Sequence, residues 1–147
     1  MLSAVVDSTV LVSAFLSSQG AAAAVLLRGV MRVFMCSLAM EIIAETTRAL
    51  HYPHIRERYT YTDEEIEAYG VYLQGTFQMV TNVPPLAGVV RDPNDDVILA
   101  CAVAAEASHV VTRDRDLLSL GTYEGITIVT PEAFLGLLRE REARDAP

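Results

Sequence analysis

Acidic side chains are the residues of this sequence whose types and spacing could support chemistry. Carboxylates that are brought together repel one another and shift towards protonation unless a positive charge neutralises them, and a divalent cation is the simplest source of that charge. Mg²⁺ and Mn²⁺ bind hard oxygen ligands and leave positions open for phosphate oxygens, which suits the hydrolysis of phosphodiester bonds. The acids in question occupy four segments: Asp7, Glu41 with Glu45, Asp95 with Asp96, and Asp114 with Asp116.

Two of these segments come directly after predicted strands. Residues 2–6 are a short apolar run that ends at Asp7, and residues 109–112 are a second run that is followed by Asp114. If these strands are neighbours in a parallel sheet, their carboxyl ends share one rim, which is where open α/β sheets bind ligands. The sequence therefore predicts that these carboxylates meet at that rim.

The other two segments are predicted to lie on helices that begin near the same rim. Glu41 and Glu45 are one helical turn apart, so they share a face, and helical phase favours Glu45 as the inward residue. Asp95 and Asp96 precede an apolar helix whose positive dipole end tolerates acids. Asp96 is the expected ligand because Val97 and the apolar run follow it directly. Both choices stay open at this stage.

Each acid also has a purely structural interpretation. Asp7 could cap the helix that follows it, and Asp114 could cap its own short helix with Asp116 as a partner of the helix dipole. Asp92 precedes Pro93 and is a better turn former than metal ligand. The prediction of a metal site therefore depends on the common placement of the acids rather than on any one of them.

The order of the predicted elements indicates an α/β fold. Strands alternate with helices, and parallel pairing needs long crossover connections, so we expect a three-layer α/β/α sandwich with a mainly parallel sheet of four to five strands. Residues 1–140 are predicted to form one domain and residues 141–147 a frayed charged tail. Ser37 is a predicted helix cap, and Thr62 with Glu65 a predicted capping box. The predicted strands are 2–6, 32–36, 78–81, 109–112 and 126–129, and the predicted helices are 10–16, 21–30, 38–50, 62–77, 97–107, 114–118 and 130–142.

The charge of the chain limits the chemistry that it could perform. A formal net charge of −8 argues against a nucleic-acid partner unless bound metal supplies positive charge. The basic residues are all arginine, and the absence of lysine excludes phosphate-loop nucleotide hydrolysis and Schiff-base chemistry. Arginine still binds phosphate well.

The remaining composition predicts a soluble, cytoplasmic protein. No apolar stretch is long enough to span a bilayer, and the first residues lack the pattern of a secretory signal. Cys36 and Cys101 lie in apolar surroundings, where a reduced and buried thiol is expected. The apolar helix face over residues 21–27 predicts a homodimer or a higher homo-oligomer.

Taken together, these segments resemble a PIN domain, in particular the bacterial VapC-type ribonucleases that are toxins of toxin–antitoxin pairs. The resemblance runs nearly from end to end of the chain. It implies a PIN-like nuclease domain over residues 1–140 that cleaves RNA with Mg²⁺ or Mn²⁺, and a small antitoxin protein as a partner. The segments that carry it are Val5–Ala14, Ser37 with Glu45 and Leu50, Arg91–Asp96 leading into Ile98–Ala100, Val111–Leu118, and Ile128–Leu135.

Residue by residue, the resemblance assigns roles at the predicted rim. Position 9 departs from the pattern because it is Thr where this group usually has Asn, so a shorter hydroxyl must orient Asp7 or a metal-bound water. Substrate contacts are expected from Ser8, Thr9, Arg113 and Arg115. Metal binding and catalysis are implied for Asp7, Glu45, Asp96 and Asp114, with Asp116 as an additional metal ligand.

Other functional classes find less support in the sequence. A Ser-His-Asp hydrolase needs a Gly-x-Ser-x-Gly turn, which is absent, and Asp7-Ser8-Thr9 is not the glycine-rich turn of a dinucleotide site. His51 and His54 have a spacing that zinc could use, but Pro53 separates them and no cysteine accompanies them. Residues 52–61 are a solvated connection or a surface on which single-stranded RNA stacks. An inactive PIN-like scaffold, or a housekeeping RNA-processing nuclease with no antitoxin, stays open as an alternative to the toxin.

Overall fold

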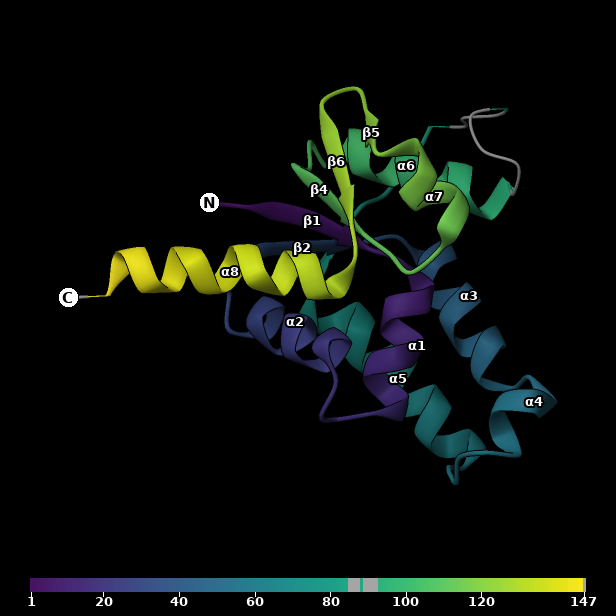
Figure 1. The fold of residues 1–147 in the computed structure, drawn as a ribbon. Coiled ribbons are helices and arrows are strands. Elements are labelled where there is room, and N and C mark those ends of the chain that lie inside the picture. Colours follow the sequence, from purple (N-terminus) through teal and green to yellow (C-terminus); the bar gives the residue numbers. More distant parts are fainter. Residues whose placement is uncertain (85–87, 89–92, 147) are drawn as a thin grey trace.

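A six-stranded sheet forms the centre of the protein (Figure 1). The structure is a computed structural model and describes residues 1–84, 88 and 93–146. The strands are β1 (Ser3–Val6), β2 (Met35–Leu38), β3 (Gln78–Met79), β4 (His109–Val111), β5 (Thr122–Tyr123) and β6 (Ile126–Val129). Their order in the sheet is β3-β2-β1-β4-β6-β5, with β5 antiparallel to β6 and every other neighbouring pair parallel. The predicted, mainly parallel sheet is confirmed.

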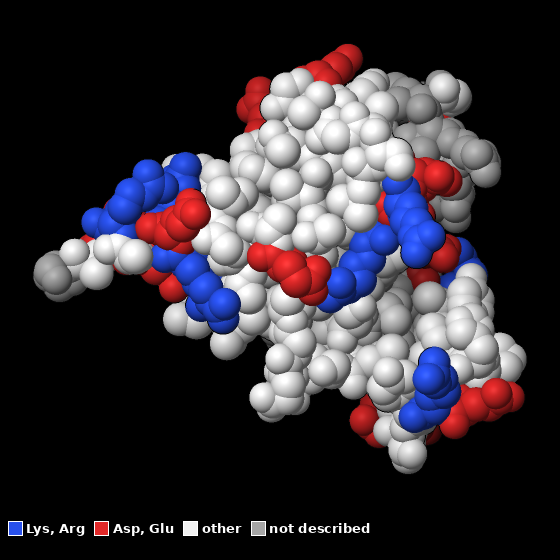
Figure 2. Space-filling model, in the orientation of Figure 1, with Lys and Arg blue, Asp and Glu red and all other residues white. Residues whose placement is uncertain are grey.

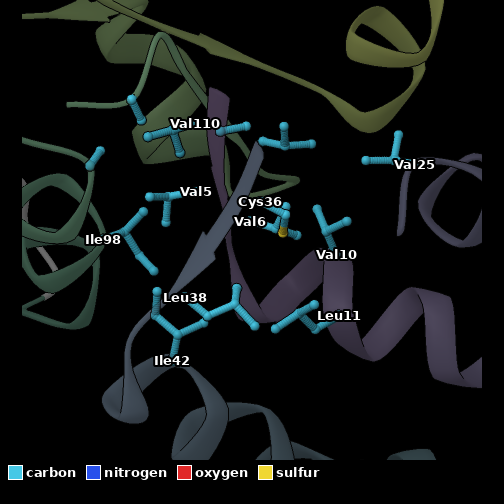
Figure 3. Packing of buried hydrophobic residues seen from close by; sticks show 14 of the residues in the cluster. Val5, Val6, Val10, Leu11, Val25, Cys36, Leu38, Ile42, Ile98 and Val110 are labelled. Atoms are coloured by element: carbon cyan, nitrogen blue, oxygen red, sulfur yellow. The ribbon is translucent and has the colours of Figure 1, made fainter. Parts of the chain in front are cut away.

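Helices cover both faces of this sheet. They are α1 (Ser8–Leu16), α2 (Ala21–Val30), α3 (Met40–Leu50), α4 (Pro53–Arg56), α5 (Asp63–Thr76), α6 (Pro93–Ala104), α7 (Arg115–Leu120) and α8 (Pro131–Asp145). Helix α6 packs on β1 and β4, whereas α1 packs on α2 and α3, and α2 packs on α8. Figure 3 shows Ile98 of α6 on one side of the central strands and Val10 and Leu11 of α1 on the other. The three-layer arrangement is therefore as predicted.

The register of the central strands places their carboxyl ends side by side. Val5 pairs with Ser37 of β2 and with Val110 of β4, and Val6 pairs with Val111. Parallel strands in register end at the same edge of a sheet, so the residues that follow β1 and β4 are neighbours. This edge, the rim, is where Asp7 and Thr112 lie.

The core is built from β-branched and aliphatic side chains on these strands and helices. Val5, Val6 and Val110 have no exposed surface, and neither has Leu11 of α1 (Figure 3). Burying one such side chain contributes roughly 1.5–3 kcal/mol. Strands that are buried on both faces read as continuous apolar runs, which is why β1 and β4 could be recognised in the sequence.

Several element boundaries differ from those predicted. Strand β2 begins at Met35 rather than at residue 32, because Arg32 adopts a positive φ in the turn that closes α2. Ser37 therefore lies in β2 and is not a helix cap, and α3 begins after Ala39 without a side-chain hydrogen bond. The segment at Pro53, predicted as a connection, forms the short helix α4.

The last third of the chain shows further differences. Strand β5 was not predicted because its two residues are too few to show an alternating pattern. Helix α6 begins at Pro93, which is favoured in a first helical turn, rather than at Val97. Helix α8 continues to Asp145, beyond the predicted end near Glu142, and Glu142 is paired with Arg28 of α2 at 2.8 Å.

Other expectations are confirmed. Thr62 and Glu65 form the predicted capping box at the start of α5. Cys36 and Cys101 are both buried and both are reduced thiols. None of the helices in the described part of the chain is long and apolar enough on its own to cross a membrane.

Candidate metal centre

Asp7 is held at the rim by the two central strands. It directly follows β1, its amide donates to the Val111 carbonyl of β4 at 2.9 Å, and it is the N-cap of α1. Only 3% of its surface is exposed. Asp7 therefore caps a helix, as the structural interpretation proposed, and at the same time presents a nearly buried carboxylate at the carboxyl edge of the sheet.

Three groups donate short hydrogen bonds to this carboxylate. The amide of Ser8 donates to Oδ1 at 2.7 Å, whereas the hydroxyls of Thr9 and Thr112 donate to Oδ2 at 2.8 and 2.7 Å. The Ser8 hydroxyl lies farther from Oδ1, at 3.4 Å. Hydrogen bonds to the ionised form of a carboxyl favour that form.

Burial nevertheless dominates the ionisation of Asp7. Desolvation raises the pKa of the Asp7 carboxyl above its ordinary value, and the hydrogen bonds from Thr112, Thr9 and Ser8 only partly oppose this rise. The negative charge of Asp114 raises the pKa further. A cation at the rim would supply the charge that stabilises ionised Asp7.

Asp114 lies at the rim just after β4. It is the N-cap of α7, and its Oδ1 accepts from the amides of Asp116 at 2.9 Å and Leu117 at 3.1 Å. Its own amide donates to the Thr112 hydroxyl at 2.9 Å. The capping role considered in the sequence is therefore present, and Asp114 also lines the same pocket as Asp7.

The two acids at the start of α6 have different surroundings. Asp95 lines the pocket with Asp7 and Asp114, whereas Asp96 does not. Oδ2 of Asp96 instead accepts from the amide of Gly88 at 3.1 Å. Asp95, rather than the expected Asp96, is thus the acid of this pair that lines the pocket. Asp92, assigned to a turn from the sequence, lies outside the described residues.

Helix α3 contributes both of its candidate acids. Glu41 and Glu45 line the pocket together, so the choice between them was unnecessary. Glu41 is exposed and Glu45 is half-buried, which agrees with Glu45 as the more inward residue. Glu45 is also paired with Arg48 on the same helix.

The acids of α6 and α7 lie close enough to share an ion. One oxygen each from Asp95, Asp114 and Asp116 can be chosen so that all three lie within 4.8 Å of one another. Asp116 is exposed and stands at the edge of this group. The pocket at the rim is lined by Asp7, Ser8, Thr9, Glu41, Ile42, Glu45, Asp95, Val97, Ile98 and Asp114.

The predicted substrate-binding residues divide into two groups. Ser8 and Thr9 line the pocket, and Arg113 and Arg115 do not. The guanidinium of Arg113 instead binds both carboxylate oxygens of Glu132 in α8, at 3.1 and 2.9 Å. Arg115 begins α7 and is exposed.

Thr112 is a site residue that the sequence analysis did not identify. It is fully buried, donates to Asp7 and accepts from the amide of Asp114, so it joins two acids of the pocket. A signal was present, because a polar residue ends the apolar run 109–111 directly before Arg113 and Asp114.

Comparison with known proteins agrees with this arrangement. The PIN domain family profile matches residues 3–116, a span that contains every acid of the pocket. No curated protein sequence matches the chain.

One similar solved structure shares the fold. It is a chain of VapBC2 from Rickettsia felis, crystallised with a DNA fragment from the promoter, and its TM-score with this chain is 0.55. The likeness covers 86% of this chain and 97% of that chain at 10% sequence identity, so it speaks for the fold alone. With a family match over most of its length and an acidic pocket at the carboxyl rim of a parallel sheet, this chain belongs to the PIN domain family.

Proposed function

We propose that the chain is an endoribonuclease that hydrolyses RNA phosphodiester bonds with Mg²⁺ or Mn²⁺. The observation that carries the proposal is the meeting of Asp7, Asp95 and Asp114 from three separate elements in one pocket, where Asp7 is nearly buried. Carboxylates so arranged are a donor set of hard oxygens, which fits these ions. When bound, the metal would activate water and stabilise charge on the attacking and leaving oxygens.

The residues of the chain have separable parts in this proposal. We assign metal binding to Asp7, Asp95 and Asp114, which line one pocket with Glu45. Asp116 lies close to Asp95 and Asp114 and is an additional candidate ligand. We assign to Asp96 the role of holding Gly88, whose amide donates to its carboxylate. Thr9 and Thr112 hold the Asp7 carboxylate in place.

A bound metal ion would also supply the positive charge that a chain of net charge −8 needs in order to bind RNA. On the face drawn in Figure 2, basic side chains form separate groups beside acidic ones and do not merge into one basic patch. Binding of RNA by arginine alone is therefore not what this face favours. Arg113 and Arg115 flank Asp114 and are the basic residues that we assign to substrate phosphates.

A cleavage assay tests the enzyme. Purified protein, freed of metal with a chelator, is incubated with a generic single-stranded RNA with and without Mn²⁺, and compared with Asp7→Asn. The matched control is Asp145→Asn, an exposed acid at the end of α8. We expect cleavage that needs Mn²⁺, is lost in Asp7→Asn and is kept in Asp145→Asn. Equal cleavage by wild type and Asp7→Asn would remove the mechanism proposed here. No cleavage with any divalent ion would leave an inactive scaffold as the better description.

We further propose that this nuclease is the toxin of a toxin–antitoxin pair. Its support is the likeness of fold to VapBC2, together with the PIN domain match. The proposal requires a small antitoxin reading frame beside the gene, and growth arrest on overexpression that the antitoxin relieves. Harmless overexpression and no such neighbour would favour a housekeeping RNA-processing nuclease.

Self-association is the last part of the proposal. In α2, Leu27 is 55% exposed and Met31, just after the helix, is 64% exposed, so an apolar surface faces outward. Exposed apolar patches of this kind are frequent in homodimer interfaces. Light scattering should give the mass of a dimer or a higher oligomer, and a monomer would reject this part alone.

A further inference from the structure

We infer that Thr9 is a positioning residue that restricts Asp7 to one metal-binding oxygen, and so selects small octahedral ions over Ca²⁺. This inference rests on the proposed metal centre. The proposed function makes Asp7 a metal ligand but does not say whether one or both of its carboxylate oxygens bind the metal, and this inference concerns that number.

The hydrogen bonds of Asp7 divide unequally between its two oxygens. A carboxylate oxygen has two lone pairs in its plane. Both lone pairs of Oδ2 are taken, by the hydroxyls of Thr9 at 2.8 Å and Thr112 at 2.7 Å. One lone pair of Oδ1 accepts from the Ser8 amide at 2.7 Å. The nearest donor to the second lone pair of Oδ1 is the Ser8 hydroxyl, which is 3.4 Å away.

The direction of the two threonine bonds is fixed by backbone donors. The amide of Arg113 donates to Thr9 Oγ1 at 3.0 Å, and the amide of Asp114 donates to Thr112 Oγ1 at 2.9 Å. An amide N–H can only donate, so each hydroxyl oxygen accepts a hydrogen bond from the backbone and the hydroxyl donates its own to Asp7. Oδ2 thus accepts two hydrogen bonds, one from α1 and one from the end of β4, whose directions are set by two adjacent amides.

The hydrogen bonds of Asp114 also divide unequally between its two carboxylate oxygens. Both amides that it caps, those of Asp116 and Leu117, donate to Oδ1 at 2.9 and 3.1 Å. Within the described part of the chain, no protein hydrogen bond reaches the Oδ2 of Asp114. Asp7 therefore has a lone pair available for a metal only on Oδ1, and Asp114 has its Oδ2 available.

This arrangement has a consequence for the choice of ion. Ca²⁺ takes six to eight oxygens at about 2.3–2.6 Å and is often bound by both oxygens of a carboxylate. Mg²⁺ requires near-octahedral ligands at about 2.0–2.1 Å and is satisfied by single oxygens and water. Asp7 with Oδ2 occupied can supply only the second kind of ligand, and Thr9 makes the bond that most directly enforces this, because it lies in the pocket itself.

Calorimetric titration of the full chain with MnCl₂ and with CaCl₂ tests the inference. The wild type is compared with Thr9→Val, which keeps the shape and removes the hydroxyl, with Thr9→Ser, which keeps the hydroxyl, and with Thr9→Ala. The matched control is Thr46→Val, because Thr46 is a buried threonine whose hydroxyl donates to the Ile42 carbonyl in α3. Circular dichroism establishes that each variant is folded, and Thr9→Ala carries the test if Thr9→Val is not.

We expect the wild type to bind Mn²⁺ more tightly than Ca²⁺. In Thr9→Val and Thr9→Ala the ratio of the Ca²⁺ Kd to the Mn²⁺ Kd should fall about tenfold, the lower end of what loss of a hydrogen-bonding partner does at metal sites. Thr9→Ser and Thr46→Val should keep the wild-type ratio. An unchanged ratio in folded Thr9→Val and Thr9→Ala, with Mn²⁺ still bound, would overturn this inference and leave the proposed function standing. A wild type that binds neither ion would overturn both.

Discussion

Thr112 Oγ1 lies 2.7 Å from Asp7 Oδ2 and donates a hydrogen bond to it, although the two residues are 105 positions apart in the chain. The bond crosses from the end of β4 to the end of β1, the two strands at the middle of the sheet. Thr112 also accepts from the amide of Asp114. One buried hydroxyl thus fixes the relative positions of two proposed metal ligands.

Removal of this hydroxyl should weaken both the site and the fold. In Thr112→Val we expect Mn²⁺ affinity to fall about 10- to 100-fold, as is usual when a ligand loses its hydrogen-bonding partner. The free energy of unfolding should fall by about 1–3 kcal/mol, because a buried acceptor and a buried amide lose their partner. Calorimetry and urea denaturation measure the two effects. Thr112→Ser keeps the hydroxyl. If its Mn²⁺ affinity and stability were no higher than those of Thr112→Val, side-chain shape would matter at this position and the hydrogen bond to Asp7 would not.

The two acids at the start of α6 should behave differently. Asp95 lines the pocket, whereas Asp96 accepts from Gly88 outside it. Asp95→Asn should therefore lower Mn²⁺ affinity by about 100-fold or more, whereas Asp96→Asn should cost about tenfold, the lower end of the range for residues that act through others. Titration of both variants with Mn²⁺ decides the matter. The reverse order would restore Asp96 as the ligand.

The raised pKa of Asp7 predicts a pH dependence of stability in metal-free protein. A carboxyl whose pKa is higher in the folded chain than in the unfolded chain favours folding at low pH, and this contribution is lost as the pH rises through the folded-state pKa. Asn at position 7 does not titrate. The stability of wild type relative to Asp7→Asn should therefore decline as the pH is raised from about 4, near the ordinary pKa of an aspartate, in the presence of a chelator. Urea denaturation at a series of increasing pH values measures it, and a relative stability that rises with pH would contradict the assignment of a raised pKa.

Bound Mn²⁺ should offset the loss of folding stability that ionised Asp7 causes. A ligand that binds only the folded state adds about 2.7 kcal/mol of stability at a concentration 100 times its Kd. We expect Mn²⁺ to raise the melting temperature of wild type and of Asp145→Asn but to leave Asp7→Asn nearly unchanged. Thermal denaturation with and without Mn²⁺ provides the measurement. Equal stabilisation of Asp7→Asn would place the ion at some other site.

Glu132 should compete with RNA for Arg113. The guanidinium binds both oxygens of Glu132, and this hydrogen bond lowers the pKa of the Glu132 carboxyl. Arginine binds phosphate with the same two-pronged geometry, so Glu132→Gln should release Arg113 and strengthen binding of single-stranded RNA. Arg113→Ala should weaken binding and reduce the salt dependence by about one charge. Fluorescence anisotropy at several salt concentrations measures both, with Glu140→Gln in the exposed part of α8 as the control.

The sequence was sufficient for five of the six strands and for the segments that line the pocket. Asp7 and Asp114 could be placed because each follows a continuous apolar run, and parallel strands end at a common edge. Asp95 could not be separated from Asp96, because a helix start uncertain by a few residues changes which side chain faces inward. Thr112 was missed because a hydroxyl acquires its role through contacts with Asp7 and Asp114 that only the folded chain creates.

Diffraction from crystals soaked in Mn²⁺, measured for anomalous scattering, tests the central claim most directly. We predict an ion in contact with Asp7 Oδ1 and Asp114 Oδ2, with Asp95 in its coordination sphere and Asp7 Oδ2 still bonded to Thr9 and Thr112. An ion bound away from Asp7, or a pocket that stays without one at saturating Mn²⁺, would contradict the account.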